Sequence, residues 1–411
     1  MGILDAPGIT PSRRAKIGGG IVYWGDSITA AMVQTNATVK YSSIESPLAW
    51  AQHLSGYRFF PATNAGVPGD RTDQVLARFS TVSAAAPRVV VIECGTNDAV
   101  QDISAATIQT NLTTLIARAQ GLGASVIVSG IPPRNALTAG QRIVRNTVNR
   151  WLADNASTLG YVFVNVDGAL TDTGSSQQYL ANHSQDGTHP NGAAALKWGT
   201  LIANALKALA PQTDLIPSLQ YDPKLLSASM QQLGSGSSPG TGITGVLSTG
   251  WGCTALNGTV TATASKVART DNLTGEWQSI NVTAQSTETT GTRMQLNTTT
   301  GFTPGTDTVY AFAEYELGSD VTIMNDLSVN LATVAPGSSI VQQVQAMSNT
   351  AGTVQTTAHR TLLASLSAGR KGILITERAL IDPTATSSLN LELRFAGLGT
   401  VKWGRAGIMK V

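Results

Sequence analysis

The stretch Ile21-Val22-Tyr23-Trp24-Gly25-Asp26-Ser27-Ile28 predicts a buried strand that ends in a tight turn. Four apolar residues in a row, bounded by a glycine, are typical of a strand that is covered on both faces. Because Gly25 and Asp26 favour turns, the strand should end here and present Ser27 at its carboxyl end. Ser27 is therefore the first candidate nucleophile, although a Gly-Asp-Ser tripeptide alone is weak information in a chain rich in glycine and serine.

Similar short apolar runs recur along the first half of the chain and alternate with amphipathic segments. Strands are expected at 21–24, 89–93, 125–129 and 161–166. Helices are expected at 107–120, 140–158 and 192–209. Alternation of this kind predicts a parallel sheet with helices on both faces. We therefore expect a three-layer α/β/α sandwich over residues 18–215, preceded by an N-terminal segment of residues 1–17.

The second half of the chain has a different composition. A Gly/Ser/Pro-rich run at 234–242 cannot bury a core, so residues 216–245 are predicted to be a flexible linker. Residues 246–411 are rich in threonine and alternate with period two, which indicates antiparallel strands. Strands are expected at 259–263, 279–283, 308–316, 372–376 and 388–395. This half is predicted to be an all-β sandwich that resembles a jelly roll.

Two short patterns in the linker imitate functional motifs. Residues 236–240 fit G-x-S-x-G, and residues 240–245 fit G-x-G-x-x-G. The first pattern functions only at a strained turn between a strand and a helix, and the second only where a helix begins. A linker supplies neither context, so we expect neither pattern to be functional.

Composition excludes several classes of protein. The net charge is +2, only 13% of residues are charged, and the basic residues are dispersed, which argues against nucleic-acid binding. No apolar run reaches the 18 or more residues of a membrane span. The four histidines are scattered and the two cysteines, Cys94 and Cys253, are far apart, so neither a metal site nor a disulfide framework is expected. Cys94 ends an apolar run and is predicted to be a buried core residue.

The first residues lack the basic and apolar segments of a signal peptide. The expected location is therefore extracellular after removal of a leader, or within a virion, which leaves its host by lysis.

Three polar blocks follow Ser27 along the chain. They are Asn64-Ala65-Gly66-Val67-Pro68-Gly69-Asp70, Gly95-Thr96-Asn97-Asp98 and Asp186-Gly187-Thr188-His189-Pro190-Asn191. A serine hydroxyl becomes a good nucleophile only when a base removes its proton and a further group orients that base. Asp186 and His189, three residues apart, can supply both functions from one loop.

Together the four blocks resemble the SGNH, or GDSL-type, hydrolase family, over roughly residues 18–210. The serine, glycine, asparagine and histidine that name the family fall here on Ser27, Gly69, Asn97 and His189. The resemblance implies a triad in which Asp186 orients His189. It also implies an oxyanion hole made by the Ser27 and Gly69 N–H groups and the Asn97 amide, and chemistry without a cofactor.

Other residues near the blocks have simpler interpretations. His183 lies six residues before His189, but no aspartate precedes it by three residues and no Pro-Asn follows it, so His189 is preferred as the base. Asp26, Asp70 and Asp98 are predicted to shape their turns by hydrogen bonding.

The resemblance implies a serine esterase, and the attached β module is similar to those of carbohydrate-active or bacteriophage tail esterases. The expected substrate is a small acyl ester, an acetyl group above all, on a carbohydrate or polysaccharide, and a phage tail protein that deacetylates host glycans fits this pattern. A lipase or thioesterase on longer chains and a non-catalytic glycan-binding protein are the alternatives. The β domain is expected to contact glycan or to form a homo-oligomer, with Trp251, Trp277 and Trp403 as either contact or core residues.

Overall fold

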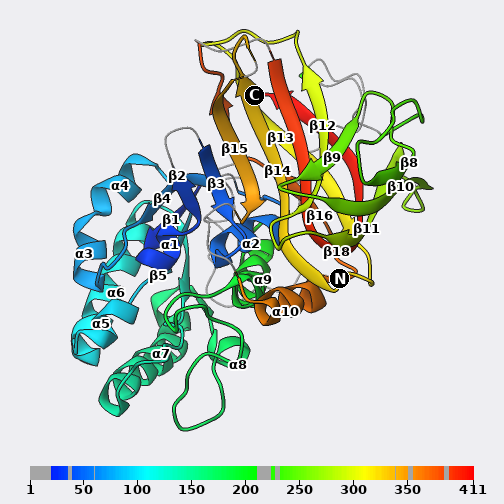
Figure 1. Ribbon diagram of the computed structural model, residues 1–411. Helices are drawn as coiled ribbons and strands as arrows, with labels where there is room; N and C mark the ends of the chain where they lie inside the picture. The colour runs from blue at the N-terminus through cyan, green and yellow to red at the C-terminus, as the bar shows by residue number, and fades with distance from the viewer. Residues whose placement is uncertain are drawn as a thin grey trace. The chain divides into compact units, whose positions relative to one another are not determined.

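The computed structural model describes residues 20–35, 39–59, 61–210, 224–226, 232–337, 339–349, 355–383 and 388–411 (Figure 1). The chain forms two compact units. Unit 1 comprises Met1–Met32 and Glu45–Thr213, and unit 2 comprises Val33–Ile44 and Asp214–Val411. The expected N-terminal segment 1–17 and much of the expected linker lie outside the described residues.

Unit 1 contains a five-stranded parallel sheet in the order β4-β1-β5-β6-β7 (Figure 1). The strands are β1 (Ile21–Gly25), β4 (Pro61–Gly66), β5 (Val89–Glu93), β6 (Ser125–Ser129) and β7 (Val162–Val164). The buried apolar runs predicted four of them. Strand β4 was missed because its sequence, Pro-Ala-Thr-Asn-Ala-Gly, has no β-branched apolar residue.

Helices cover both faces of this sheet, which confirms the three-layer α/β/α sandwich. The helices are α1 (Ser27–Ala30), α2 (Pro47–Leu54), α3 (Thr72–Ala77), α4 (Phe79–Ala84), α5 (Thr96–Val100), α6 (Ala105–Gly121), α7 (Ala139–Leu159), α8 (Asp167–Leu170) and α9 (Gly192–Leu209). On one face, Val22 and Trp24 of β1 join a core with side chains of α3, α4, α6 and α7. On the other, Trp198 of α9 donates a hydrogen bond to Ser129 of β6, and α2 packs against α9.

The long helices begin and end at residues suited to those positions. The Ser104 hydroxyl accepts the Thr107 N–H at the start of α6, and Thr138 with Gln141 forms a capping box at the start of α7. Gly160, with φ of 69°, ends α7 in the left-handed region. Local sequence therefore determines where these helices lie along the chain.

Unit 2 is rich in β-strands, as expected. Its strands are β2 (Val33–Thr35), β3 (Val39–Ser43), β8 (Ile243–Gly245), β9 (Gly252–Leu256), β10 (Val260–Ala268), β11 (Glu276–Gln285), β12 (Gly291–Thr298), β13 (Thr308–Leu317), β14 (Ile323–Val334), β15 (Ile340–Ser348), β16 (Lys371–Ile375), β17 (Ala379–Leu380) and β18 (Ser388–Lys410). Helix α10 (Thr357–Ser367) was not predicted.

Strand β18 belongs to two sheets. Its first half pairs with β12 and β14, and its second half pairs with β11 and β13. Gly399 lies where the pairing changes, with φ of 116°, and an added Cβ would lie 2.6 Å from the Cα of Val321. Glycine allows the strand to turn there without a steric clash.

The hairpin β2–β3 belongs to unit 2, although the predicted range 18–215 placed it in the first domain. Strand β3 pairs in parallel with β15, and Val39 lies opposite Gln343. The Ile44 N–H donates to the Ser348 carbonyl at 3.2 Å. Pairing with a strand some 300 residues away assigns the segment to unit 2.

Residues 232–245 of the expected linker are part of unit 2 and pack against its strands, so the prediction of a separate linker is wrong for them. Gly242 and Gly245 have φ of 81° and 97°, and added Cβ atoms would lie 2.1 Å from the Val260 carbonyl oxygen and 2.0 Å from that of Ala264. The glycines allow this segment to approach β10 closely and to form β8. Neither imitation motif lies between a strand and a helix.

The three tryptophans considered for glycan contact are core residues. Trp251, Trp277 and Trp403 are 1%, 6% and 0% exposed. The guanidinium of Arg269 lies 4.5 Å from the centre of the Trp277 ring. Of the two interpretations considered for these side chains, glycan contact and core, the structure supports core, because they fill the interior of unit 2.

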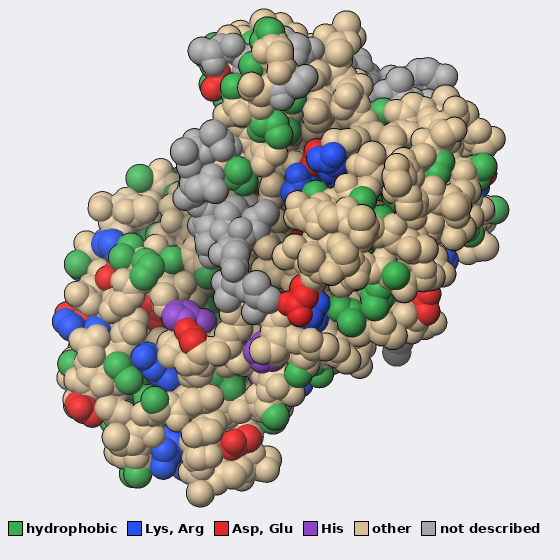
Figure 2. Space-filling model, viewed as in Figure 1, with side chains coloured by type: hydrophobic (Ala, Val, Ile, Leu, Met, Phe, Trp, Pro, Cys, Tyr) green, Lys and Arg blue, Asp and Glu red, His purple; other side chains and the backbone are tan. Residues whose placement is uncertain are grey.

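Charged side chains on the face seen in Figure 2 are scattered among neutral ones, in keeping with the low charged content of the chain. Within the described ranges, every helix is too short or too polar to cross a membrane.

Candidate active site

Three of the predicted site residues follow neighbouring strands at one edge of the sheet of unit 1 (Figure 1). Ser27 is the first residue of α1 after β1, Gly69 follows β4, and Asn97 lies in α5 after β5. Strand β1 lies between β4 and β5. The chain passes from β1 to β4 on one side and then from β4 to β5 on the other side of β1, so the strand order reverses at β1. Open α/β sheets form a binding crevice at such a position.

Ser27, His189 and Asp186 form a hydrogen-bonded chain. The Ser27 Oγ lies 2.9 Å from His189 Nε2, and His189 Nδ1 lies 2.7 Å from Asp186 Oδ2. In this arrangement the ring can take the serine proton on Nε2 while the carboxylate holds the proton on Nδ1. The structure thus brings together the three residues that the sequence proposed as a triad.

The loop that carries Asp186 is held by its own backbone. Asp186 Oδ1 accepts the N–H groups of Thr188 at 2.8 Å and His189 at 2.7 Å. Partial burial raises the pKa of Asp186, but the hydrogen bonds from the His189 ring and from these two N–H groups outweigh burial and hold it at about 2. Asp186 is therefore ionised across the neutral range, as an orienting carboxylate must be.

The start of α9 fixes the position of His189. Asn191 caps the helix by accepting the N–H groups of Ala193 and Ala194 at 3.0 and 3.1 Å. Its amide also donates to the Asn182 carbonyl at 2.7 Å. His189 lies two residues before this cap, so the start of α9 anchors the base.

Two of the predicted oxyanion donors, Asn97 and Gly69, are positioned in different ways. The Asn97 Nδ2 donates one hydrogen bond to the Asp70 carbonyl at 3.0 Å, which leaves a second N–H on the same amide. Gly69 is exposed and has φ of 85°, and an added Cβ would meet no protein atom within 4 Å. The positive φ at this position favours glycine, whereas no neighbouring protein atom would exclude a larger side chain.

Arg78 is a supporting residue that sequence reasoning missed. Its guanidinium donates to the Ala65 carbonyl at 2.7 Å and the Gly25 carbonyl at 3.1 Å, and it forms an ion pair with Asp70 at 2.7 Å. These contacts connect the end of β1, the end of β4 and the loop that carries Gly69. No local signal distinguishes this arginine from the others in the chain.

Of the aspartates next to the site residues, Asp26 shapes its own turn as expected, whereas Asp98 bonds to the start of α3. Asp26 Oδ1 accepts the Ile28 N–H at 3.0 Å, and Asp98 accepts both the N–H and the hydroxyl of Thr72 at 2.9 and 2.6 Å. Burial raises the pKa of Asp98, against the effect of these hydrogen bonds.

His183, the other candidate base, contacts the backbone instead of Ser27. It is 4% exposed, and its Nδ1 lies 2.8 Å from the Ala181 carbonyl. Cys94 and Cys253 are both buried, and burial raises the pKa of each thiol. They are core residues, as predicted for Cys94.

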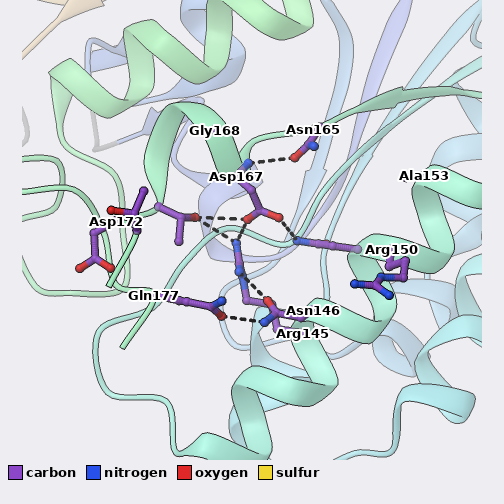
Figure 3. Close-up of a pocket in the computed structure, with 12 residues that line it drawn as sticks. Arg145, Asn146, Arg150, Ala153, Asn165, Asp167, Gly168, Asp172 and Gln177 are labelled. Carbon is purple, nitrogen blue, oxygen red and sulfur yellow. Dashed lines mark hydrogen bonds and ion pairs between the residues drawn. The ribbon is translucent and has the colours of Figure 1, made fainter. Parts of the chain in front are cut away.

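A separate polar pocket of about 580 Å³ lies between α7 and α8 (Figure 3). It is lined by Arg145, Asn146, Asn149, Arg150, Ala153, Asn165, Asp167, Gly168, Thr171, Asp172, Thr173 and Gln177. Arg145 already donates hydrogen bonds to Asp167, Asn146 and two backbone carbonyls. None of the predicted site residues lines this pocket.

Among the described residues, no three His, Cys, Asp or Glu side chains gather as a metal site would require.

A parallel α/β/α sheet with a Ser-His-Asp chain at its carboxyl edge has the arrangement of a serine hydrolase. Residues 23–195 match the model of the GDSL-like Lipase/Acylhydrolase family, and the chain therefore carries a domain of that family. Membership supports ester hydrolysis as the activity of this domain.

Known proteins are similar to part of this chain. Esterase TesA of Pseudomonas aeruginosa is 34% identical over 112 residues, which are 26% of this chain and 53% of that protein, so the chain spans about half the length of that relative. Among solved structures, one of TesA is 24% identical and covers 46% of this chain and 99% of its own, with a TM-score of 0.38.

Two further solved structures are comparable. A lipase/acylhydrolase from Enterococcus faecalis is 25% identical and covers 48% of this chain and 99% of its own, with a TM-score of 0.37. A GDSL-like lipase from Bacteroides thetaiotaomicron is 18% identical and covers 50% and 93%, with a TM-score of 0.38.

Proposed function

We propose that this protein is a serine esterase that removes short acyl groups, acetyl above all, from a carbohydrate or polysaccharide. The observation that carries the proposal is the chain from Ser27 Oγ to His189 Nε2 at 2.9 Å and from His189 Nδ1 to Asp186 at 2.7 Å. In the reaction, His189 takes the proton of Ser27 as its oxygen attacks the ester carbonyl. The bond from the carbonyl carbon to the alcohol oxygen then breaks, and His189 gives its proton to the departing alcohol as the acyl-enzyme forms. In the second half, His189 removes a proton from water, the water oxygen attacks the acyl carbonyl, and the proton returns to Ser27 as the acid leaves.

Asn97 and the N–H groups of Gly69 and Ser27 would stabilise the oxyanion of each tetrahedral intermediate. We prefer a polymeric substrate because the catalytic side chains are accessible from solvent. The side chains of His189 and Asp186 are 44% and 53% exposed, so an ester on a bulky chain can reach them. The threonine-rich, weakly charged unit 2 is the second support, since neutral polar surfaces suit sugar hydroxyls.

A series of p-nitrophenyl esters separates this proposal from a lipase or thioesterase. We expect kcat/KM to fall from acetate to octanoate and acetate to be released from acetylated polysaccharides. A rate that rises with chain length would favour the lipase or thioesterase, and sugar binding with no ester turnover from pH 6 to 9 would favour a glycan-binding protein.

Ser27→Ala tests the nucleophile, and Ser80→Ala on the exposed side of α4 is the matched control. The first variant should lose at least about 10³-fold in kcat and all labelling by a serine-directed organophosphonate. The control should keep both. Labelling that persists in Ser27→Ala would identify another nucleophile.

The proposal extends to an extracellular or virion-associated location, with bacterial surface glycans as the substrate of a phage tail protein, and to self-association through unit 2. Its support is the pairing of an esterase domain with a β-rich unit. Sedimentation of the full chain at several concentrations, with and without acetylated bacterial polysaccharide, tests assembly and substrate together.

A further inference from the structure

Two carboxyl groups lie buried directly beside the nucleophile. Asp26 precedes Ser27 and is 0% exposed, and Glu93 ends β5 and is 2% exposed. The sheet register fixes both, because Gly25 lies opposite Glu93 and the Asp26 N–H donates to the Glu93 carbonyl at 3.3 Å. Neither carboxyl group forms an ion pair with an arginine or lysine among the described residues.

Each carboxyl group uses one oxygen on a donor of the first turn of α1. Asp26 Oδ1 accepts the Ile28 N–H at 3.0 Å, and Glu93 Oε2 accepts the Thr29 hydroxyl at 2.9 Å. The remaining oxygens, Asp26 Oδ2 and Glu93 Oε1, are buried and have no donor among the described residues. The two side chains are within hydrogen-bonding reach of each other.

Two carboxylates cannot hydrogen-bond to each other unless one of them carries a proton. Burying two unpaired charges would also cost free energy, and usually the pKa of one group rises until that group is neutral. Burial raises the pKa of Asp26 to about 7 and raises that of Glu93 well above its ordinary value. Both groups accept one donor, but the hydrogen bond between them lowers the pKa of Asp26 and raises that of Glu93, so Glu93 is the group that holds the proton.

We propose that Asp26 and Glu93 share one proton, donated from Glu93 Oε1 to Asp26 Oδ2, and that this bond positions the turn that presents Ser27. Both are positioning residues, since Ser27 and His189 do the chemistry. The role in catalysis rests on the proposed esterase function. The other titratable groups that interact with the pair are His189, Asp98, Cys94 and Tyr179.

Glu93→Gln is the decisive variant, because its amide replaces the neutral O–H donor at nearly the same volume. We expect kcat/KM for p-nitrophenyl acetate to stay within about threefold of wild type. Glu93→Leu keeps the volume but leaves Asp26 Oδ2 without a donor, and should lower kcat/KM by at least about tenfold, mainly through kcat. Glu276→Gln, on β11 of unit 2, is the control for loss of a carboxylate.

A spectroscopic measurement tests the proton independently of activity. The infrared spectrum of the full chain at pH 7 should contain the C=O band of a buried protonated carboxylic acid, and the band should be absent from Glu93→Gln and present in Glu276→Gln. Removal of this proton at alkaline pH should lower kcat/KM of the wild type, and this decrease should be smaller in Glu93→Gln. A purely structural role of Glu93 would not change the pH profile in this way.

Two results would overturn the proposal: a spectrum of Glu93→Gln identical to that of wild type, or a loss in Glu93→Gln as large as in Glu93→Leu. If Glu93→Leu does not fold, the infrared comparison still decides. Wild-type protein that shows the band but hydrolyses no ester would refute the proposed function and leave the shared proton established.

Discussion

Replacing Arg78 with alanine should weaken unit 1 and slow catalysis together. The guanidinium makes hydrogen bonds to the Ala65 and Gly25 carbonyls and an ion pair with Asp70, whose side chain is 13% exposed. A hydrogen bond that involves a charged group contributes about 1.5–3 kcal/mol, but the Arg78 side chain is 25% exposed and water replaces part of this. We therefore expect Arg78→Ala to lower the free energy of unfolding by about 2–4 kcal/mol.

The assay is urea and thermal unfolding, followed in parallel by esterase activity and tryptophan fluorescence. A loss of 2–4 kcal/mol corresponds to a fall of about 5–15 °C in the Tm of a domain of this size. The transition that coincides with loss of activity belongs to unit 1 and is the one that should move. Since the Gly69 loop and the Ser27 turn would no longer be tied together, kcat should fall by about 10–100-fold.

Arg71→Ala is the matched control, because Arg71 pairs with Asp73 at the surface, where the partner side chain is 52% exposed. Such pairs contribute about 0–1 kcal/mol. Arg78→Lys should be intermediate, since one ammonium cannot reach all three acceptors. If Arg78→Ala unfolds no earlier than Arg71→Ala and keeps full kcat, Arg78 does not connect the loops as the contacts indicate.

Four further outcomes are expected. Asn97→Ala should lower kcat by about 10²–10³-fold without a large change in Tm, and full activity would remove this residue from the oxyanion hole. Asp186→Asn should lower kcat by about 10⁴-fold, because the His189 ring would lose the charge that orients it. In the wild type, a pH series of kcat should show no titration of Asp186 above pH 4, since its pKa is about 2. Gly199→Ala should destabilise unit 1 by about 1–3 kcal/mol, because an added Cβ would lie 2.4 Å from a tryptophan Cβ of α2. Gly121→Ala, where an added Cβ meets nothing within 4 Å, should stabilise the fold by up to about 1 kcal/mol, and a similar effect of both changes in urea unfolding would contradict the packing argument. Burial raises the pKa of Asp326 to about 6, so its contribution to stability is present below about pH 4 and is lost as the pH rises through 6; Asp326→Asn should remove up to about 1.4 kcal/mol per pH unit from this slope in pH-dependent unfolding.

The grouping of Ser27, His189 and Asp186 could be predicted because its residues lie in short blocks, one after β1 and one in the loop before α9. Ser27 follows a continuous apolar run, and Asp186 and His189 are three residues apart in one loop. Chemistry of this kind requires particular residue types at a fixed local spacing, and such spacing is visible in a sequence. The central strands were predicted for a similar reason, since burial on both faces demands continuous apolar runs.

Long-range pairing could not be predicted in the same way. Strand β3 pairs with β15, and β18 pairs with four different strands, and no local pattern specifies either arrangement. Strand propensity depends on the surrounding sheet, so the polar sequence of β15, with glutamines at 342, 343 and 345, gave no signal. The glycine-rich segment before β9 was misjudged because glycine permits close backbone contact as well as flexibility.

The same contrast applies within the site. Residues that would touch the substrate follow strands and are accompanied by glycines with positive φ, such as Gly69, Gly95 and Gly187. The residues that hold them have no distinguishing motif: Arg78 lies between α3 and α4, and Glu93 is the last residue of β5. Their roles depend on which carbonyl or carboxyl group the fold brings next to them, and this is determined by the register of β1 with its two neighbours. Substitutions at such supporting positions should therefore impair the reaction as strongly as some changes in the blocks themselves.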